Sequence, residues 1–153
     1  MYGIRIYQIM HKKKRILALD VGTKRIGMAI TDELGYTVQP LTVISRRTDE
    51  KTVEEIKKIV IRYNVEKVVI GLPITLKDEI GKMAQEILTF ANKLRSDLDI
   101  PIVSWDESFT TIEAEDILIK EADLSRRKQK KLKDKIAASF ILESYLRGRN
   151  EAN

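Results

Sequence analysis

The stretch ILALDVGTKRIGMAI, residues 16–30, decides the fold, because two strand-like apolar segments flank a short polar turn. Residues 16–19 and 26–30 are almost wholly apolar, as expected of buried strands. Asp20 ends the first segment, shortly before Gly22. Burying an isolated carboxylate costs several kcal/mol. Asp20 therefore either caps the turn that follows it or interacts with a charged partner.

The pattern of apolar and turn-forming residues outward from this stretch predicts an α/β fold. Three strands joined by short turns indicate an antiparallel meander, and two later apolar strands that alternate with helices indicate parallel additions. The result is a five-stranded mixed sheet flanked by helices in one domain. The predicted strands cover residues 15–21, 26–31, 36–44, 67–71 and 101–105, and the predicted helices cover 49–63, 80–94, 111–121 and 129–147. Pro40 suggests that the third strand is irregular or lies at an edge of the sheet.

The composition narrows the chemistry. The 153 residues include no cysteine and a single histidine, His11. This excludes disulfides, thiolate metal sites and histidine-dependent acid–base catalysis, so a hydrolytic site would rest on carboxylates, lysines, hydroxyls or a metal held by oxygen ligands. No apolar run approaches the roughly 20 residues of a membrane span, and we expect a cytoplasmic protein that does not bind membranes.

Positive charge is concentrated in two clusters. Lysine and arginine total 28 against 23 acids. The clusters are HKKKR at residues 11–15 and RRKQKKLKDK at 126–135. They are either solvated surface runs or the contact region for a polyanion such as a nucleic acid. On the second interpretation, the candidate phosphate contacts are Lys24, Arg25, Arg126, Arg127, Lys128, Lys130 and Lys131.

Three acids are candidate active-site residues. Asp20 and Glu107 lie at predicted strand ends, and Asp134 shares a helix face with Ala137 and Ala138, whose small side chains allow close packing on the sheet. Converging carboxylates repel one another unless a hard cation such as Mg²⁺ or Mn²⁺ lies between them. Each acid also has a structural explanation: Asp20 as a turn residue, Glu107 as a solvated loop acid and Asp134 as a helix-start residue. Their joint placement favours a metal site.

The segment SWDESFTT contributes two further candidates. Thr110 and Glu113 form a capping box, which explains Thr110 structurally, but the same helix start could receive a phosphate. On that interpretation Thr110 and Thr111 contact nucleic acid.

The chain resembles the YqgF family of RuvC-like Holliday junction resolvases and pre-16S rRNA nucleases. The resemblance covers roughly residues 15–147, which leaves residues 1–14 as an N-terminal extension. It rests on LDVGTKRIGMAITD at 19–32, QPL at 39–41, VVIGLP at 68–73, DESFTT at 106–111 and DKIAASFILESYL at 134–146. It implies a ribonuclease H-like fold and matches Asp20, Glu107 and Asp134 to the acidic, metal-binding catalytic positions. One departure concerns Ser108, which occupies the place where the family usually carries an arginine.

The resemblance implies a divalent-metal-dependent endonuclease, with maturation of the 5′ end of 16S rRNA precursors as its first candidate function. The expected partners are structured RNA, branched DNA or ribosomal precursor particles, bound by a monomer or homodimer. Two alternatives stay open: a Holliday junction resolvase acting on four-way DNA, and a non-catalytic RNA-binding factor in ribosome assembly.

Overall fold

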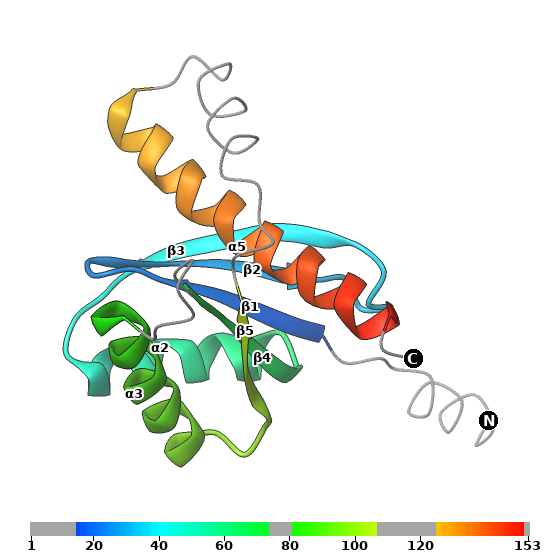
Figure 1. The fold of residues 1–153 in the computed structure, drawn as a ribbon, viewed down its shortest axis with the longest axis horizontal. Helices are drawn as coiled ribbons and strands as arrows, with labels where there is room; N and C mark the ends of the chain where they lie inside the picture. Colours follow the sequence, from blue (N-terminus) through cyan, green and yellow to red (C-terminus); the bar gives the residue numbers. More distant parts are fainter. Residues whose placement is uncertain (1–14, 74–80, 107–124, 152–153) are drawn as a thin grey trace.

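The computed structural model describes residues 15–73, 81–106 and 125–151 (Figure 1). The predicted helix at 111–121 and the N-terminal extension lie outside these residues. The strands are β1 (Arg15–Val21), β2 (Arg25–Thr31), β3 (Val38–Ser45), β4 (Val65–Leu72) and β5 (Ile102–Asp106), and the helices are α2 (Asp49–Arg62), α3 (Lys82–Asp97) and α5 (Arg126–Glu151).

The five strands form one mixed sheet in the order β3-β2-β1-β4-β5. The β1–β2 and β2–β3 pairs are antiparallel, whereas β4 lies parallel to both β1 and β5. β3 is an edge strand, and its register with β2 shifts where Pro40 pairs with Ala29. Because proline cannot donate a ladder hydrogen bond, an edge position with a shifted register suits it. The predicted mixed sheet and the irregular third strand are therefore confirmed.

The sheet is covered on both faces, by α2 and α3 on one side and by α5 on the other (Figure 1). Successive strand residues point to opposite faces. In β1, Leu17 and Leu19 join the core beneath α2 and α3, while Ile16 and Ala18 pack with residues of α5. In β2, Ala29 belongs to the α5 side. This alternation fixes which side chains the α5 face presents.

α5 begins earlier than the expected residue 129. The Ser125 carbonyl accepts a hydrogen bond from the Gln129 amide at 2.8 Å, and its hydroxyl accepts one from the Lys128 amide at 3.4 Å. Ser125 therefore acts as the N-cap. The expected start was wrong because the first turns of α5 are cationic and carry no apolar periodicity. None of the helices within 15–73, 81–106 and 125–151 is long and apolar enough to cross a bilayer.

Candidate active site

Asp20 lies near the C-terminal end of β1 on the α5 face of the sheet. It follows Ile16 and Ala18 at the strand period of two, and both of those side chains pack with α5 residues. The turn after it is tight: the Gly22 amide donates to the Arg25 carbonyl at 2.8 Å, and Arg46 donates to the Gly22 carbonyl at 3.0 Å. Asp20 is thus held on a strand whose exit is fixed by hydrogen bonds.

α5 crosses β2 at very short range. A Cβ atom added to Gly27 would lie 2.1 Å from the Asp134 carbonyl oxygen and 3.0 Å from the Asp134 Cβ. Only glycine permits this approach. Gly27 of β2 is paired with Asp20 of the neighbouring strand β1. The close crossing of α5 over Gly27 therefore brings Asp134 near Asp20.

The two carboxylates interact electrostatically. Burial raises the pKa of Asp20 to about 6, and the nearby Asp134 carboxylate adds to the rise, while Lys133 acts in the opposite direction. Like charges at short range disfavour simultaneous ionisation. The Asp20–Asp134 pair therefore stores unfavourable electrostatic energy that a bound cation would relieve.

Arg25 pairs with the second acid of the site. Its Nε donates to Asp134 Oδ2 at 2.7 Å, with side-chain exposures of 37% for Arg25 and 22% for Asp134. This ion pair joins the first residue of β2 to the first half of α5. No local sequence pattern indicates this ion pair, because its two residues are far apart in the chain. Arg25 was expected only to contact nucleic acid.

A basic groove adjoins the acid pair, between the β1–β2 turn, the end of β3 and the first turns of α5. Its volume is about 340 Å³. The lining residues are Lys24, Arg25, Val43, Ile44, Ser45, Arg127, Lys130 and Lys131. Arg127, Lys130 and Lys131 recur at helical spacing with Asp134, so one stripe of α5 carries both the cations and the acid.

The predicted site residues separate into three groups. Asp20, Asp134 and five of the predicted cations meet at the acid pair and the groove. Arg126 and Lys128 are exposed on α5 but do not line the groove. Glu107, Thr110 and Thr111 lie outside the described residues, although Glu107 directly follows Asp106, the last residue of β5.

The donor set fits a hard divalent cation. Asp20 and Asp134 offer carboxylate oxygens, the ligand type that Mg²⁺ and Mn²⁺ prefer, and their mutual repulsion favours a cation between them. Among residues 15–73, 81–106 and 125–151 there is no cluster of three or more metal-ligating side chains. A divalent ion at these two acids would therefore need further oxygen ligands, such as water or substrate oxygens.

Sequence reasoning missed two residues that shape this site. Lys133 lowers the pKa of Asp20 and lies next to Asp134 in the chain, so its proximity to the acids was readable in principle. Arg46 reaches the Gly22 carbonyl from just beyond β3. That contact depends on how β3 returns alongside the β1–β2 turn, which a local pattern does not reveal.

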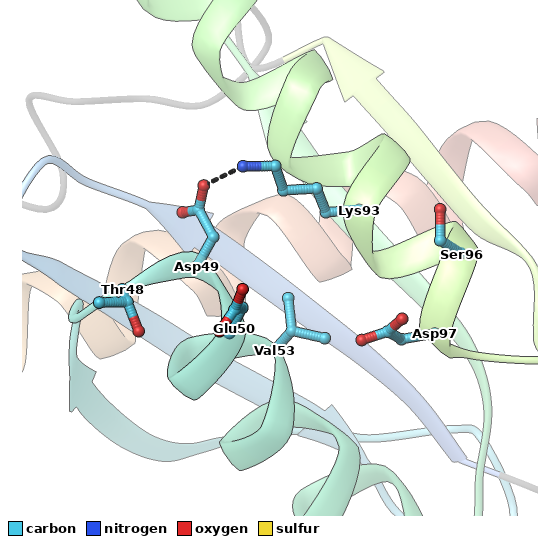
Figure 2. Close-up of a pocket in the computed structure, with 7 residues that line it drawn as sticks. All are labelled: Thr48, Asp49, Glu50, Val53, Lys93, Ser96 and Asp97. Carbon is cyan, nitrogen blue, oxygen red and sulfur yellow. Dashed lines mark hydrogen bonds and ion pairs between the residues drawn. The ribbon is translucent and has the colours of Figure 1, made fainter.

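A second cavity, of about 500 Å³, lies between α2 and α3 on the opposite face of the sheet from α5 (Figure 2). Asp49 forms an ion pair there with Lys93, and Arg46 approaches Asp49 at 4.0 Å. The Asp49–Lys93 ion pair ties α2 to α3. We assign the cavity a structural role.

The strand order and the helices on both faces place the protein in the ribonuclease H-like class of folds. Two solved structures share this fold. Thermus thermophilus RuvC has a TM-score of 0.56 at 12% identity, over 87% of this chain and 95% of that one. The fowlpox virus resolvase, solved with its substrate Holliday junction DNA, has a TM-score of 0.52 at 14% identity, over 86% and 99%. At these identities the likeness concerns the fold alone.

Sequence comparison identifies the family. The profile of the RuvX family, described as a Holliday junction resolvase, matches residues 14–148. A relative from Desulforudis audaxviator is 46% identical over 135 residues, covering 88% of this chain and 95% of its own length. Another, from Caldanaerobacter subterraneus subsp. tengcongensis, is 48% identical over 132 residues, covering 86% and 95%. Both bear the name "Putative pre-16S rRNA nuclease". The chain belongs to the RuvX family, which confirms the resemblance to the YqgF proteins and places it in a family of nucleases.

Proposed function

We propose that this protein is a divalent-metal-dependent endonuclease that matures the 5′ end of precursor 16S rRNA in the cytoplasm. The observation that carries the proposal is the meeting of Asp20 and Asp134 beside a groove with five cationic side chains. Two acids that repel one another suit a divalent cation, and the cations beside them suit a phosphate backbone. The relatives named as pre-16S rRNA nucleases support the choice of substrate.

In this proposal the residues have separate roles. Asp20 and Asp134 hold Mg²⁺ or Mn²⁺, and Glu107 completes the set of acids. When bound, such an ion would lower the pKa of an attacking water and stabilise the leaving oxygen. Lys133 helps to keep Asp20 ionised at neutral pH. Lys24, Arg127, Lys130 and Lys131 position the backbone through phosphate contacts, which carry little sequence information.

The decisive test compares Asp20→Asn and Asp134→Asn with Asp99→Asn, a change at an exposed acid outside the site. Purified variants would be incubated with precursor 16S rRNA and Mn²⁺ or Mg²⁺. We expect the first two to lose cleavage by at least about a hundredfold, since each removes one of the two acids proposed to hold the ion, while Asp99→Asn cleaves like the wild type. Undiminished cleavage by Asp20→Asn with an unchanged fold would remove the catalytic assignment.

A second candidate substrate is the four-way DNA junction. The family description and the RuvC-like fold favour it, and it uses the same acids and groove. Cleavage of precursor RNA and of a four-way DNA junction under the same metal and salt conditions separates the two. If neither is cleaved but RNA is bound, the remaining alternative is a non-catalytic factor that acts on ribosomal precursor particles.

A further inference from the structure

Arg25 is the one residue that both pairs with an acid of the site and lines the groove, among the residues that the structure describes. Its Nε is committed to Asp134 Oδ2 at 2.7 Å. A guanidinium carries five N–H donors in a planar fork, so the same group offers further donors to a phosphate. Arg25 thus stands where the proposed metal site and the proposed substrate groove meet.

The ion pair occupies an oxygen that a metal would use. While Arg25 holds Oδ2, a cation has one fewer oxygen of Asp134 available and sits beside a fixed positive charge. The pair is also accessible, with exposures of 37% and 22% for its two side chains. An incoming phosphate can therefore compete for the guanidinium, because arginine forms charge-assisted hydrogen bonds with phosphate and carboxylate alike, and the contact with Asp134 is made through Nε to one oxygen.

The backbones on both sides of the pair are fixed. The Arg25 carbonyl accepts the Gly22 amide at 2.8 Å, and the Asp134 backbone is packed against Gly27. These contacts favour an exchange of partners by side-chain rotation, with β2 and α5 in place.

We propose that Arg25 is a positioning residue that holds Asp134 until a substrate phosphate in the groove takes over the guanidinium, so that substrate binding and metal binding favour one another. This inference rests on the proposed function, because it assumes that Asp134 is a metal ligand and that the groove binds phosphates. Thermodynamic reciprocity requires that the phosphate backbone strengthen metal binding by the same factor as the metal strengthens backbone binding.

The test measures Mn²⁺ affinity of the full chain by calorimetry, alone and with a phosphorothioate RNA duplex that resists cleavage. For the wild type we expect the duplex to raise Mn²⁺ affinity by roughly fivefold or more. For Arg25→Gln we expect Mn²⁺ affinity without duplex to exceed that of the wild type, and the gain on adding duplex to shrink. Lys24→Gln is the matched control, since it removes a neighbouring groove charge that does not contact Asp134 in any hydrogen bond or ion pair of the described residues.

Lys24→Gln should weaken duplex binding, yet keep the wild-type Mn²⁺ affinity without duplex and the wild-type enhancement of that affinity at saturating duplex. Arg25→Lys, which keeps the charge without the planar fork, provides a second variant if Arg25→Gln is unstable, and should lie between Arg25→Gln and the wild type. Mn²⁺ affinity that falls in Arg25→Gln, or that changes equally in Arg25→Gln and Lys24→Gln, would overturn the inference.

Failure of the proposed function has a different signature. If Asp20→Asn and Asp134→Asn bind Mn²⁺ as the wild type does, with and without duplex, then the acids are not metal ligands and the proposed function itself is wrong. If those two variants lose Mn²⁺ binding while Arg25→Gln matches the wild type throughout, only the role of Arg25 is wrong.

Discussion

At the scale of single residues, Asp20 shows how a strand can carry a carboxylate at an energetic cost. Its pKa rises from an ordinary value of 3.8 to about 6, first through burial and then through Asp134. Lys133 offsets part of this rise. A residue that destabilises the fold in its ionised form, at a place where apolar side chains would pack well, is characteristic of a functional site.

This cost predicts an unusual pH dependence of stability. Because the folded-state pKa of Asp20 lies above the unfolded value, its contribution to stability is fully present below pH 3.8 and is lost as the pH rises through about 6. Asp20→Asn removes the ionisable group. In a metal-free buffer with chelator, we expect the variant to be more stable than the wild type at pH 8, by on the order of 2–3 kcal/mol, and by much less at pH 4.

Urea unfolding of both proteins at pH 4, 6 and 8 measures this difference. Asp99→Asn, at an exposed position, serves as the control and should show no such trend. If Asp20→Asn were no more stable than the wild type at pH 8, the ionised carboxylate would carry no penalty and its burial would need another explanation.

At the scale of elements, α5 is the part that assembles the site. Its C-terminal half is anchored to β5 by Trp105. The Trp105 Nε1 donates to the Ser144 hydroxyl at 2.9 Å, and its ring makes an edge-to-face contact with Tyr145, with the ring centroids 5.4 Å apart. Lys67 of β4 donates to the Tyr145 hydroxyl at 3.0 Å. With that half fixed, the rigid helix sets where Asp134 and the cationic first turns lie.

Gly27 provides the test of this arrangement. Gly27→Ala would place a methyl group 2.1 Å from the Asp134 carbonyl, so α5 would have to shift away from β2. We expect a decrease of about 1–3 kcal/mol in the free energy of unfolding and weaker Mn²⁺ binding, because Asp134 moves with the helix.

The control for Gly27→Ala is Gly81→Ala, since an added Cβ at Gly81 meets nothing within 4 Å. Denaturant unfolding and Mn²⁺ titration of both variants measure the two effects. A Gly27→Ala variant that keeps wild-type stability and Mn²⁺ affinity would show that α5 tolerates displacement at this crossing.

The same elements show what the sequence could predict and what it could not. The strands were readable because their apolar runs are short and bounded by turn residues, and the α5 face of β1 follows from alternation once Asp20 is seen after Ile16 and Ala18. The start of α5 could not be predicted from the sequence, since only the Ser125 cap marks it. The Arg25–Asp134 ion pair could not be predicted either, because it depends on where the helix crosses the sheet.

At the scale of the whole molecule, the acids and the cations occupy one region built from β1, β2, the end of β3 and the first half of α5. Three cations of α5, namely Arg127, Lys130 and Lys131, line one groove with Lys24 and Arg25, although the two sets are far apart in the chain. A concentrated positive surface of this kind binds polyanions by releasing counterions, which makes affinity fall steeply with salt concentration.

Neutralising the α5 stripe should therefore flatten the salt dependence of binding. We expect the triple variant Arg127→Gln, Lys130→Gln, Lys131→Gln to bind an RNA duplex more weakly at low salt. The slope of log affinity against log salt should decrease in magnitude by about one for each phosphate that the protein no longer neutralises, up to about three. Fluorescence anisotropy over a range of salt concentrations measures both quantities.

A charge-matched control separates this local effect from a change in net charge. Lys51, Lys58 and Arg62 are exposed on α2, which covers the opposite face of the sheet. Replacing all three by glutamine removes the same three charges from the net +5, and Debye screening over about 8 Å at physiological salt limits its reach to the groove. We expect this control to keep nearly the wild-type slope. Equal flattening in both triple variants would mean that the duplex is held by the diffuse positive charge of the whole protein, and the groove would then have no special part in binding.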